Sequence, residues 1–123
     1  MTERIRRDTI LVIDDDPDFR SLVEAIAQMW DVAVLHAEDC RSGIEILERE
    51  QDRIKMIFLD YFMPGMPPAG CAASLIARSG KEIPIVLVTA AADPAARAAE
   101  LNLSRWLSKP FEVSDLEVLL KEP

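Results

Sequence analysis

Four apolar runs, each leading into a charged or hydroxyl residue, constrain the fold of this chain more than any other feature. The runs span 10–13, 56–59, 85–88 and 106–108, and they lead into Asp14–Asp15, Asp60, Thr89 and Lys109. They are continuous rather than alternating, which is typical of strands buried on both faces of a parallel sheet. Parallel strands would bring all of these polar groups to the carboxyl edge of one sheet, where open α/β folds place their sites.

Segments of strand length and helix length alternate along the whole chain. Strands are predicted over 9–13, 32–36, 56–59, 83–88 and 106–107. The intervening segments carry helical signals, such as an apolar stripe through Phe19, Val23 and Ile26 and a capping box of Ser114 with Glu117. This order predicts an α/β fold, a three-layer α/β/α sandwich whose five-stranded parallel sheet has the flavodoxin-like order 2-1-3-4-5 and is covered by five helices.

The composition is that of one globular domain. The chain has 123 residues, 50% of them hydrophobic and 29% charged. We expect a single domain over 1–123 with a core of about 9–121, and no output domain within these residues. The formal net charge is −8 and no basic stripe is present, so direct nucleic-acid binding is not expected.

The sequence gives no sign of a membrane span, a signal peptide or a cysteine-based scaffold. No apolar stretch approaches the roughly 20 residues of a membrane span, and the charged segment 1–7 is not followed by the apolar core of a signal peptide. Cys40 and Cys71 have no CxxC spacing, and His36 is the only histidine. A disulfide scaffold or zinc site is therefore not expected, His36 is interpreted as structural, and a reducing cytoplasm is the predicted location.

The polar groups at the predicted sheet edge suit a divalent cation and a phosphoryl group. Asp14, Asp15 and Asp60 would repel one another there, and Mg²⁺ relieves such repulsion because it prefers hard oxygen ligands. Lys109 would supply positive charge to phosphoryl oxygens and Thr89 a hydroxyl donor.

Four motifs in this order resemble the receiver domain of two-component response regulators: ILVIDDDPDFR, IFLDYFMPGM, IVLVTA and LSKPF. The resemblance covers essentially 9–120. It implies that Asp60 is phosphorylated by the phosphohistidine of a sensor histidine kinase or phosphotransfer protein. It also implies a Mg²⁺ cofactor held by Asp15, Asp60 and the backbone carbonyl of Phe62, with Asp14 acting largely through water.

The same resemblance assigns the remaining site residues and the output. Lys109, in a cis bond to Pro110, and Thr89 would contact the phosphoryl group, and small Ala90 would leave room for the donor. Thr89 and Trp106 would form the switch, with Thr89 moving toward the phosphoryl group and Trp106 turning inward. Output would pass through the face of the fourth helix, last strand and last helix to an output domain, a downstream protein or a homodimer partner. The chain would be a signalling phosphoprotein that catalyses only its own phosphorylation and slow dephosphorylation.

The chain departs from the family pattern at two places. After the MPGM segment the family usually continues with Asp-Gly, but this sequence continues with Pro67-Pro68-Ala69-Gly70. This difference indicates an insertion that stiffens the loop before a helix of about 72–79. This departure predicts altered kinase docking near the loop. Phe62 and Ala91 are apolar at positions that flank the phosphoryl group, and apolar side chains cannot orient a hydrolytic water. This predicts slow self-dephosphorylation.

Three other classes of protein share parts of this pattern. A pseudo-receiver, which uses the same fold only to bind proteins, is opposed by the intact site and kept open by the altered loop. A haloacid-dehalogenase-type phosphatase would leave Asp60 without a role and lacks an acidic pair at a strand end beyond Lys109. An FMN-binding flavodoxin is excluded, because Asp14–Asp16 would repel a phosphate after the first strand.

Overall fold

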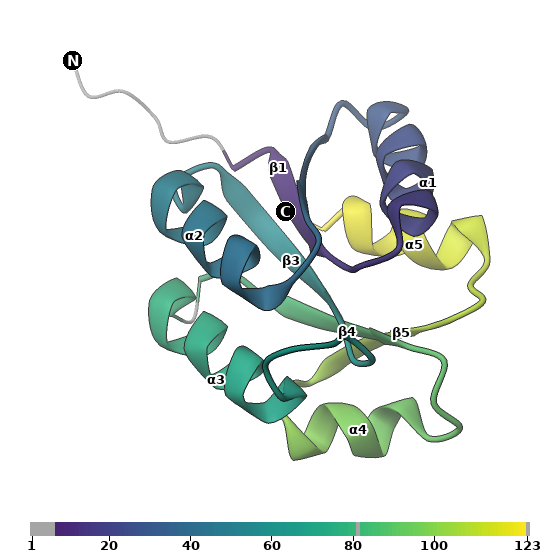
Figure 1. Cartoon of the computed structure of the whole chain (residues 1–123). Coiled ribbons are helices and arrows are strands. Elements are labelled where there is room, and N and C mark those ends of the chain that lie inside the picture. The colour runs from purple at the N-terminus through teal and green to yellow at the C-terminus, as the bar shows by residue number, and fades with distance from the viewer. Residues whose placement is uncertain (1–6, 81, 123) are drawn as a thin grey trace.

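The computed structural model describes residues 7–80 and 82–122 and contains one five-stranded parallel sheet, in the order β2-β1-β3-β4-β5. The strands are β1 (Thr9–Ile13), β2 (Ala33–Ala37), β3 (Ile54–Asp60), β4 (Ile85–Thr89) and β5 (Arg105–Ser108). The helices are α1 (Pro17–Gln28), α2 (Cys40–Glu50), α3 (Pro68–Ser79), α4 (Pro94–Glu100) and α5 (Val113–Leu120). In Figure 1, α1 and α5 cover one face of the sheet, and α2, α3 and α4 lie on the other. The predicted three-layer sandwich and its strand order are confirmed.

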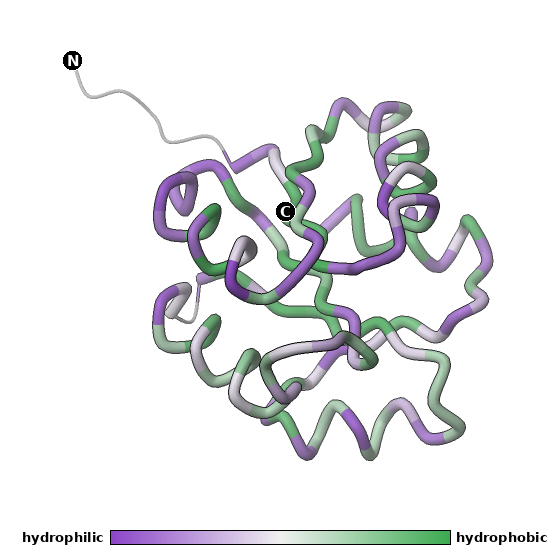
Figure 2. Tube along the Cα trace, in the orientation of Figure 1, coloured by the Kyte–Doolittle hydropathy of each residue, from purple (hydrophilic) through white to green (hydrophobic). Residues whose placement is uncertain are grey.

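Alternate residues of the central strands feed two separate cores. Leu11 and Ile13 pack with α2 and α3, whereas Ile10 and Val12 pack with α1 and α5. Both sets are fully buried. In Figure 2 the strands are mostly hydrophobic, whereas hydrophilic and hydrophobic stretches alternate along the helices. Because both faces of the central strands are buried, their sequences are continuous apolar runs.

Two helix starts differ from the sequence prediction. Helix α3 begins at Pro68, with Pro67 as its N-cap, so the adjacent prolines begin the helix rather than stiffen an extended loop. Proline suits the first helical position because its fixed φ is already helical and its missing N–H would have no partner there. Helix α5 is capped by Glu112, whose backbone N–H donates to Asp115 at 3.1 Å. The prediction of a capping box between Ser114 and Glu117 was therefore wrong.

The expectation that the two cysteines would not pair was also wrong. Cys40 and Cys71 form a disulfide with a Cα–Cα distance of 6.0 Å. Cys40 lies in the first turn of α2 and Cys71 in the first turns of α3, so the bond joins two neighbouring helices. The sequence separation of 31 residues gave no sign of this contact. It exists because both helices start at the same edge of the sheet.

The N-terminal segment 1–6, on which no signal peptide was expected, lies outside the described residues. Within the described part of the chain, no helix is long and apolar enough to cross a membrane.

At Gly43, α2 packs tightly against the sheet. A Cβ atom at this position would lie 2.5 Å from Cδ1 and 2.8 Å from Cγ1 of Ile13, whose side chain is fully buried. The tight fit positions α2, and with it the loop that follows β2, over the end of β1.

We predict that Gly43→Ala lowers the free energy of unfolding. Overpacking costs about 2 kcal/mol, and the gain of about 1 kcal/mol that alanine brings to a helix does not offset it. Adding Ile13→Val, which removes Cδ1, should restore part of the loss. Urea unfolding of both variants measures this, and an unchanged midpoint for Gly43→Ala would contradict the packing.

Candidate functional site

The five predicted site residues converge at the carboxyl edge of the sheet. Asp14 and Asp15 follow β1, Asp60 ends β3, Thr89 ends β4 and Lys109 follows β5. In the sheet register Asp60 lies opposite Val88 and Thr89 opposite Ser108, so the ends of the three strands are level. Asp14, Asp60 and Thr89 are buried, with exposed fractions of 1%, 7% and 0%.

Three carboxylates form a compact oxygen cluster. Asp14, Asp15 and Asp60 each offer an oxygen, and these atoms all lie within 4.8 Å of one another. Asp15 is exposed, so the cluster opens to solvent on one side. Carboxylate oxygens in an open site, with room for water, are the ligands that Mg²⁺ prefers. The residues present therefore fit the metal that the receiver resemblance implies.

Lys109 compensates the negative charge of the cluster. Its ammonium donates to the Asp14 carboxylate at 2.7 Å and lies 3.5 Å from Asp60. The Phe19 ring centroid is 4.3 Å from the same nitrogen. Burial lowers the pKa of Lys109, but its hydrogen bond to Asp14 and the charge of Asp60 outweigh burial and raise the pKa above its usual value. The ammonium therefore stays charged at neutral pH.

The Asp60 carboxyl group has a raised pKa. Burial and then the neighbouring charge of Asp14 raise its pKa from 3.8 to about 6, although Lys109 and the Phe62 backbone oppose the shift. The metal-free site thus holds more negative charge than Lys109 alone neutralises. An added cation would favour the ionised form of Asp60.

Thr89 and Ala90 lie on the β4 side of the cluster. The Thr89 hydroxyl accepts a hydrogen bond from the Ala91 N–H at 3.0 Å, which leaves its own proton free to donate. The Thr89 carbonyl accepts from the Lys109 N–H at 2.8 Å and joins the two loops. The Lys109–Pro110 bond is cis, as the resemblance implied.

Phe62 and Trp106 point outward. Phe62 is 58% exposed and Trp106 is 45% exposed. Trp106 lies on β5 beside Val118 and Leu119 of α5, around a shallow pocket. In this structure the predicted switch aromatic is therefore in its outward position.

Sequence reasoning missed a polar chain that holds the Asp14 loop. The Arg20 guanidinium on α1 donates to the Asp14 carbonyl at 2.5 Å and to Nδ1 of His36 at 3.3 Å. Nε2 of His36 lies 3.1 Å from Glu24. His36 is thus structural, as predicted, but its contacts lead to the site. The spacing of Arg20 and Glu24 by one helical turn was the signal that could have placed them on one face.

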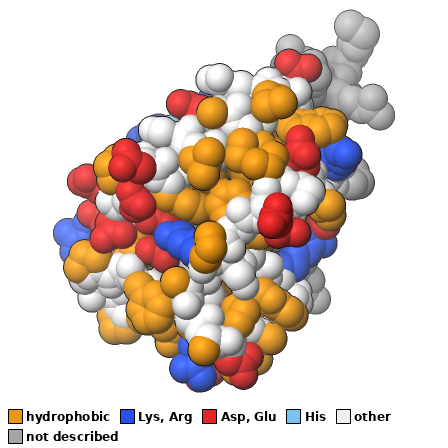
Figure 3. Space-filling model, turned by 90° about the vertical axis from the view of Figure 1, so that its right-hand side faces the viewer, with side chains coloured by type: hydrophobic (Ala, Val, Ile, Leu, Met, Phe, Trp, Pro, Cys, Tyr) orange, Lys and Arg blue, Asp and Glu red, His pale blue; other side chains and the backbone are white. Residues whose placement is uncertain are grey.

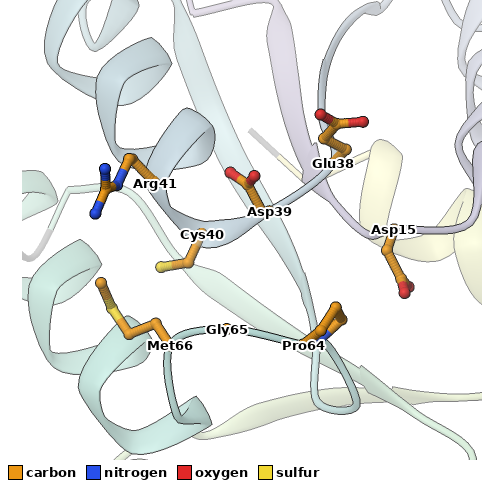
Figure 4. A pocket seen from close by; sticks show the side chains of 8 residues that line it. All are labelled: Asp15, Glu38, Asp39, Cys40, Arg41, Pro64, Gly65 and Met66. Carbon is orange, nitrogen blue, oxygen red and sulfur yellow. The ribbon is translucent and has the colours of Figure 1, made fainter.

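An open pocket adjoins the carboxylate cluster. It has a volume of about 630 Å³, and its lining residues come from three loops or helix starts: Asp15, Glu38, Asp39, Cys40, Arg41, Pro64, Gly65 and Met66. In Figure 4, Asp15 lies at one end and Cys40 and Met66 lie at the other. The pocket therefore connects the acidic site with the start of α2.

Comparison with known families identifies the class of protein. The profile of the response regulator receiver domain matches residues 10–121. The chain belongs to this family, the receiver domains of two-component response regulators.

The related proteins are regulators about twice as long as this chain. It is 29% identical over 119 residues to the probable transcriptional regulator ycf27 of Porphyridium aerugineum, across 95% of this chain and 48% of that protein. It is 28% identical over 109 residues to the transcriptional regulatory protein CpxR of Escherichia coli K12, across 87% and 45%. The chain spans about half the length of these curated relatives.

Solved receiver structures have the same fold. The chemotaxis protein CheY4 of Vibrio cholerae matches with a TM-score of 0.80 and 23% identity, over 92% of this chain and 95% of that one. A CheY-like receiver domain of Methanospirillum hungatei matches with a TM-score of 0.76 and 25% identity, over 91% and 90%.

The raised pKa of Asp60 leads to a prediction about stability. The folded chain binds this proton more tightly than the unfolded chain, so ionised Asp60 destabilises the fold above about pH 6, and the penalty disappears as the pH falls toward its ordinary value of 3.8. Without Mg²⁺, Asp60→Asn should therefore raise the free energy of unfolding by about 2 kcal/mol at pH 7.

Urea unfolding at several pH values tests this, with Asp15→Asn as a control that removes the same charge from an exposed position. The gain for Asp60→Asn should shrink as the pH falls. A gain that is independent of pH, or equal for the two variants, would contradict the account.

Proposed function

We propose that the chain is a phosphoacceptor in which Asp60 receives a phosphoryl group from the phosphohistidine of a histidine kinase or phosphotransfer protein. An Asp60 carboxylate oxygen forms a bond to phosphorus, the P–N bond breaks, and the imidazole leaves and takes up a proton. The observation that carries the proposal is the convergence of Asp60, two further carboxylates, Lys109 and Thr89 on one sheet edge.

Each residue has a role that follows from its contacts. Asp14, Asp15, Asp60 and the Phe62 carbonyl would hold Mg²⁺, which supplies positive charge for the phosphoryl oxygens when bound. Lys109, now paired with Asp14 and Asp60, neutralises a phosphoryl oxygen. The Thr89 hydroxyl and the Ala90 backbone N–H donate to the others.

The phosphodonor has an open approach on the side of Lys109. Phe19, Leu22 and Phe111 line an apolar pocket that reaches Lys109 and Ala90 and is bordered by Asp16 and Asp18. Figure 3 shows this side of the molecule, where acidic side chains gather near a basic one beside a hydrophobic area. This surface, rather than the loop before α3, is the one we assign to the kinase or phosphotransfer protein.

The output is a change of surface on α4, β5 and α5. Thr89, fully buried now, moves toward the phosphoryl group, and Trp106 turns into the space that Thr89 leaves. The altered face then binds an output domain, a downstream protein or a second copy of the chain. The chain acts on no other substrate, and it works in the cytoplasm, where such kinases present their phosphohistidine.

The first test is the intact mass of the chain after incubation with acetyl phosphate. We expect one phosphoryl adduct that requires both Mg²⁺ and Asp60, so Asp60→Asn should show none. Asp18→Asn, which removes a nearby charge outside the cluster, should be phosphorylated normally. A folded chain that forms no adduct would instead favour the pseudo-receiver, a module that binds proteins without being phosphorylated.

The apolar side chains beside the site predict a long-lived phosphoform. Phe62 and Ala91 offer no group that can orient a hydrolytic water, so Phe62→Gln should shorten the half-life about tenfold, whereas Phe62→Leu should leave it nearly unchanged. Decay of the adduct, followed by mass in Mg²⁺ buffer, measures this. A wild-type phosphoform that decays within seconds would overturn the prediction.

A further inference from the structure

The Cys40–Cys71 disulfide lies at the same sheet edge as the carboxylate site. Cys40 directly follows Asp39, the N-cap of α2, and Cys71 lies in the first turns of α3. Both residues are almost completely buried, with exposed fractions of 4% and 1%. Neither belongs to the phosphoacceptor machinery described above, and no other cysteine occurs in the chain.

The disulfide restrains the loop that carries Phe62. This loop runs from Asp60 at the end of β3 to Pro67, and its far end is tied to α3 because the Cys71 N–H donates to the Pro67 carbonyl at 3.0 Å. The Met66 side chain also lies against Gly70, since a Cβ there would be 3.6 Å from Met66 Cγ. A bond from Cys71 to α2 thus fixes the start of α3 and shortens the free part of the loop.

One cysteine of the pair borders the open pocket, although little of its own surface is exposed. Cys40 lines the pocket beside Asp15, and in Figure 4 its sulfur points from the start of α2 toward Met66. Cys71 does not line this pocket. The pocket therefore offers an attacking thiolate a route to the Cys40 side of the disulfide, with the Cys71 sulfur as the leaving group.

We propose that Cys40 and Cys71 form a redox site that exchanges with a dithiol reductant through this pocket and controls the order of the 61–67 loop. The reductant's thiolate bonds to the Cys40 sulfur, the S–S bond breaks, and Cys71 leaves as a thiolate and takes up a proton. The second thiolate of the reductant then attacks its own sulfur in the mixed disulfide, and Cys40 leaves. In total the chain gains two electrons and two protons, and the reductant becomes a disulfide.

Cys40 lies in the first turn of α2, where the helix dipole offsets part of the repulsion between its thiolate and the neighbouring carboxylates. The surrounding carboxylates of Asp15, Glu38 and Asp39 repel anionic thiols, so a neutral dithiol suits the pocket better than an anionic monothiol such as glutathione.

Reduction should loosen the loop and weaken Mg²⁺ binding. The loop supplies the Phe62 carbonyl, and a loop that is less ordered before binding loses more entropy when it is fixed. The effect on Mg²⁺ rests on the proposed function, whereas the exchange chemistry and the effect on the loop do not.

The experiment compares the oxidised chain, the chain reduced with dithiothreitol, and the double variant Cys40→Ala/Cys71→Ala. The folded chain is reduced, freed of dithiothreitol and then labelled with maleimide in denaturant, and its intact mass should show two adducts, while circular dichroism before the denaturant shows a folded chain. Hydrogen exchange of the 61–67 amides should become about threefold faster or more after reduction. Calorimetric Mg²⁺ titration should show binding about threefold weaker.

The double variant should match the reduced chain in both measurements and should not respond to dithiothreitol. Two adducts only when dithiothreitol is added in denaturant, and none after reduction of the folded chain, would overturn the exchange through the pocket. Unchanged hydrogen exchange of 61–67 would overturn the control of the loop. If no form of the chain binds Mg²⁺, the proposed function fails, while the adduct count and the hydrogen exchange still decide the redox proposal.

Discussion

The confinement of three carboxylates to one sheet edge, two of them buried, is the constraint around which this structure is organised. The parallel sheet fixes the ends of β1 and β3 side by side, so Asp14 and Asp60 cannot separate. The Lys109 ammonium lies 2.7 Å from the Asp14 carboxylate and 3.5 Å from that of Asp60. Its positive charge lowers the pKa of Asp60 only in part, so this pKa remains above its ordinary value. Because the uncompensated negative charge is unfavourable, binding a cation stabilises this site. The cation and Lys109 can then both contact a phosphoryl group.

The two sides of this site are held by different means. On the side of α1, Arg20 links the Asp14 carbonyl to His36 and Glu24, so a polar chain fixes the first loop. On the other side, the loop after Asp60 has an exposed Phe62 and depends on α3 for its position. There the disulfide between α2 and α3 provides the restraint. The first side is held by hydrogen bonds, whereas the second can respond to reduction.

The sequence predicted the fold and the site well because both depend on strand ends. A continuous apolar run indicates a buried parallel strand, and the residue after it must lie at the carboxyl edge, which placed Asp60 and Lys109 together. Contacts between helices were not predictable in this way, since the Cys40–Cys71 pair depends on how α2 and α3 pack. The start of α5 was predicted wrongly because serine is a more common N-cap than glutamate. The sequence therefore favoured Ser114 over Glu112.

The most direct test of this account is the titration of the Asp60 carboxyl group by ¹³C NMR, with and without Mg²⁺. The account predicts a pKa of about 6 in the metal-free chain. Saturating Mg²⁺ should lower it by about one unit or more, because the ion favours the charged carboxylate. An ordinary pKa near 3.8 that Mg²⁺ does not change would show that Asp60 is neither crowded by its neighbours nor a metal ligand, and would contradict the central claim.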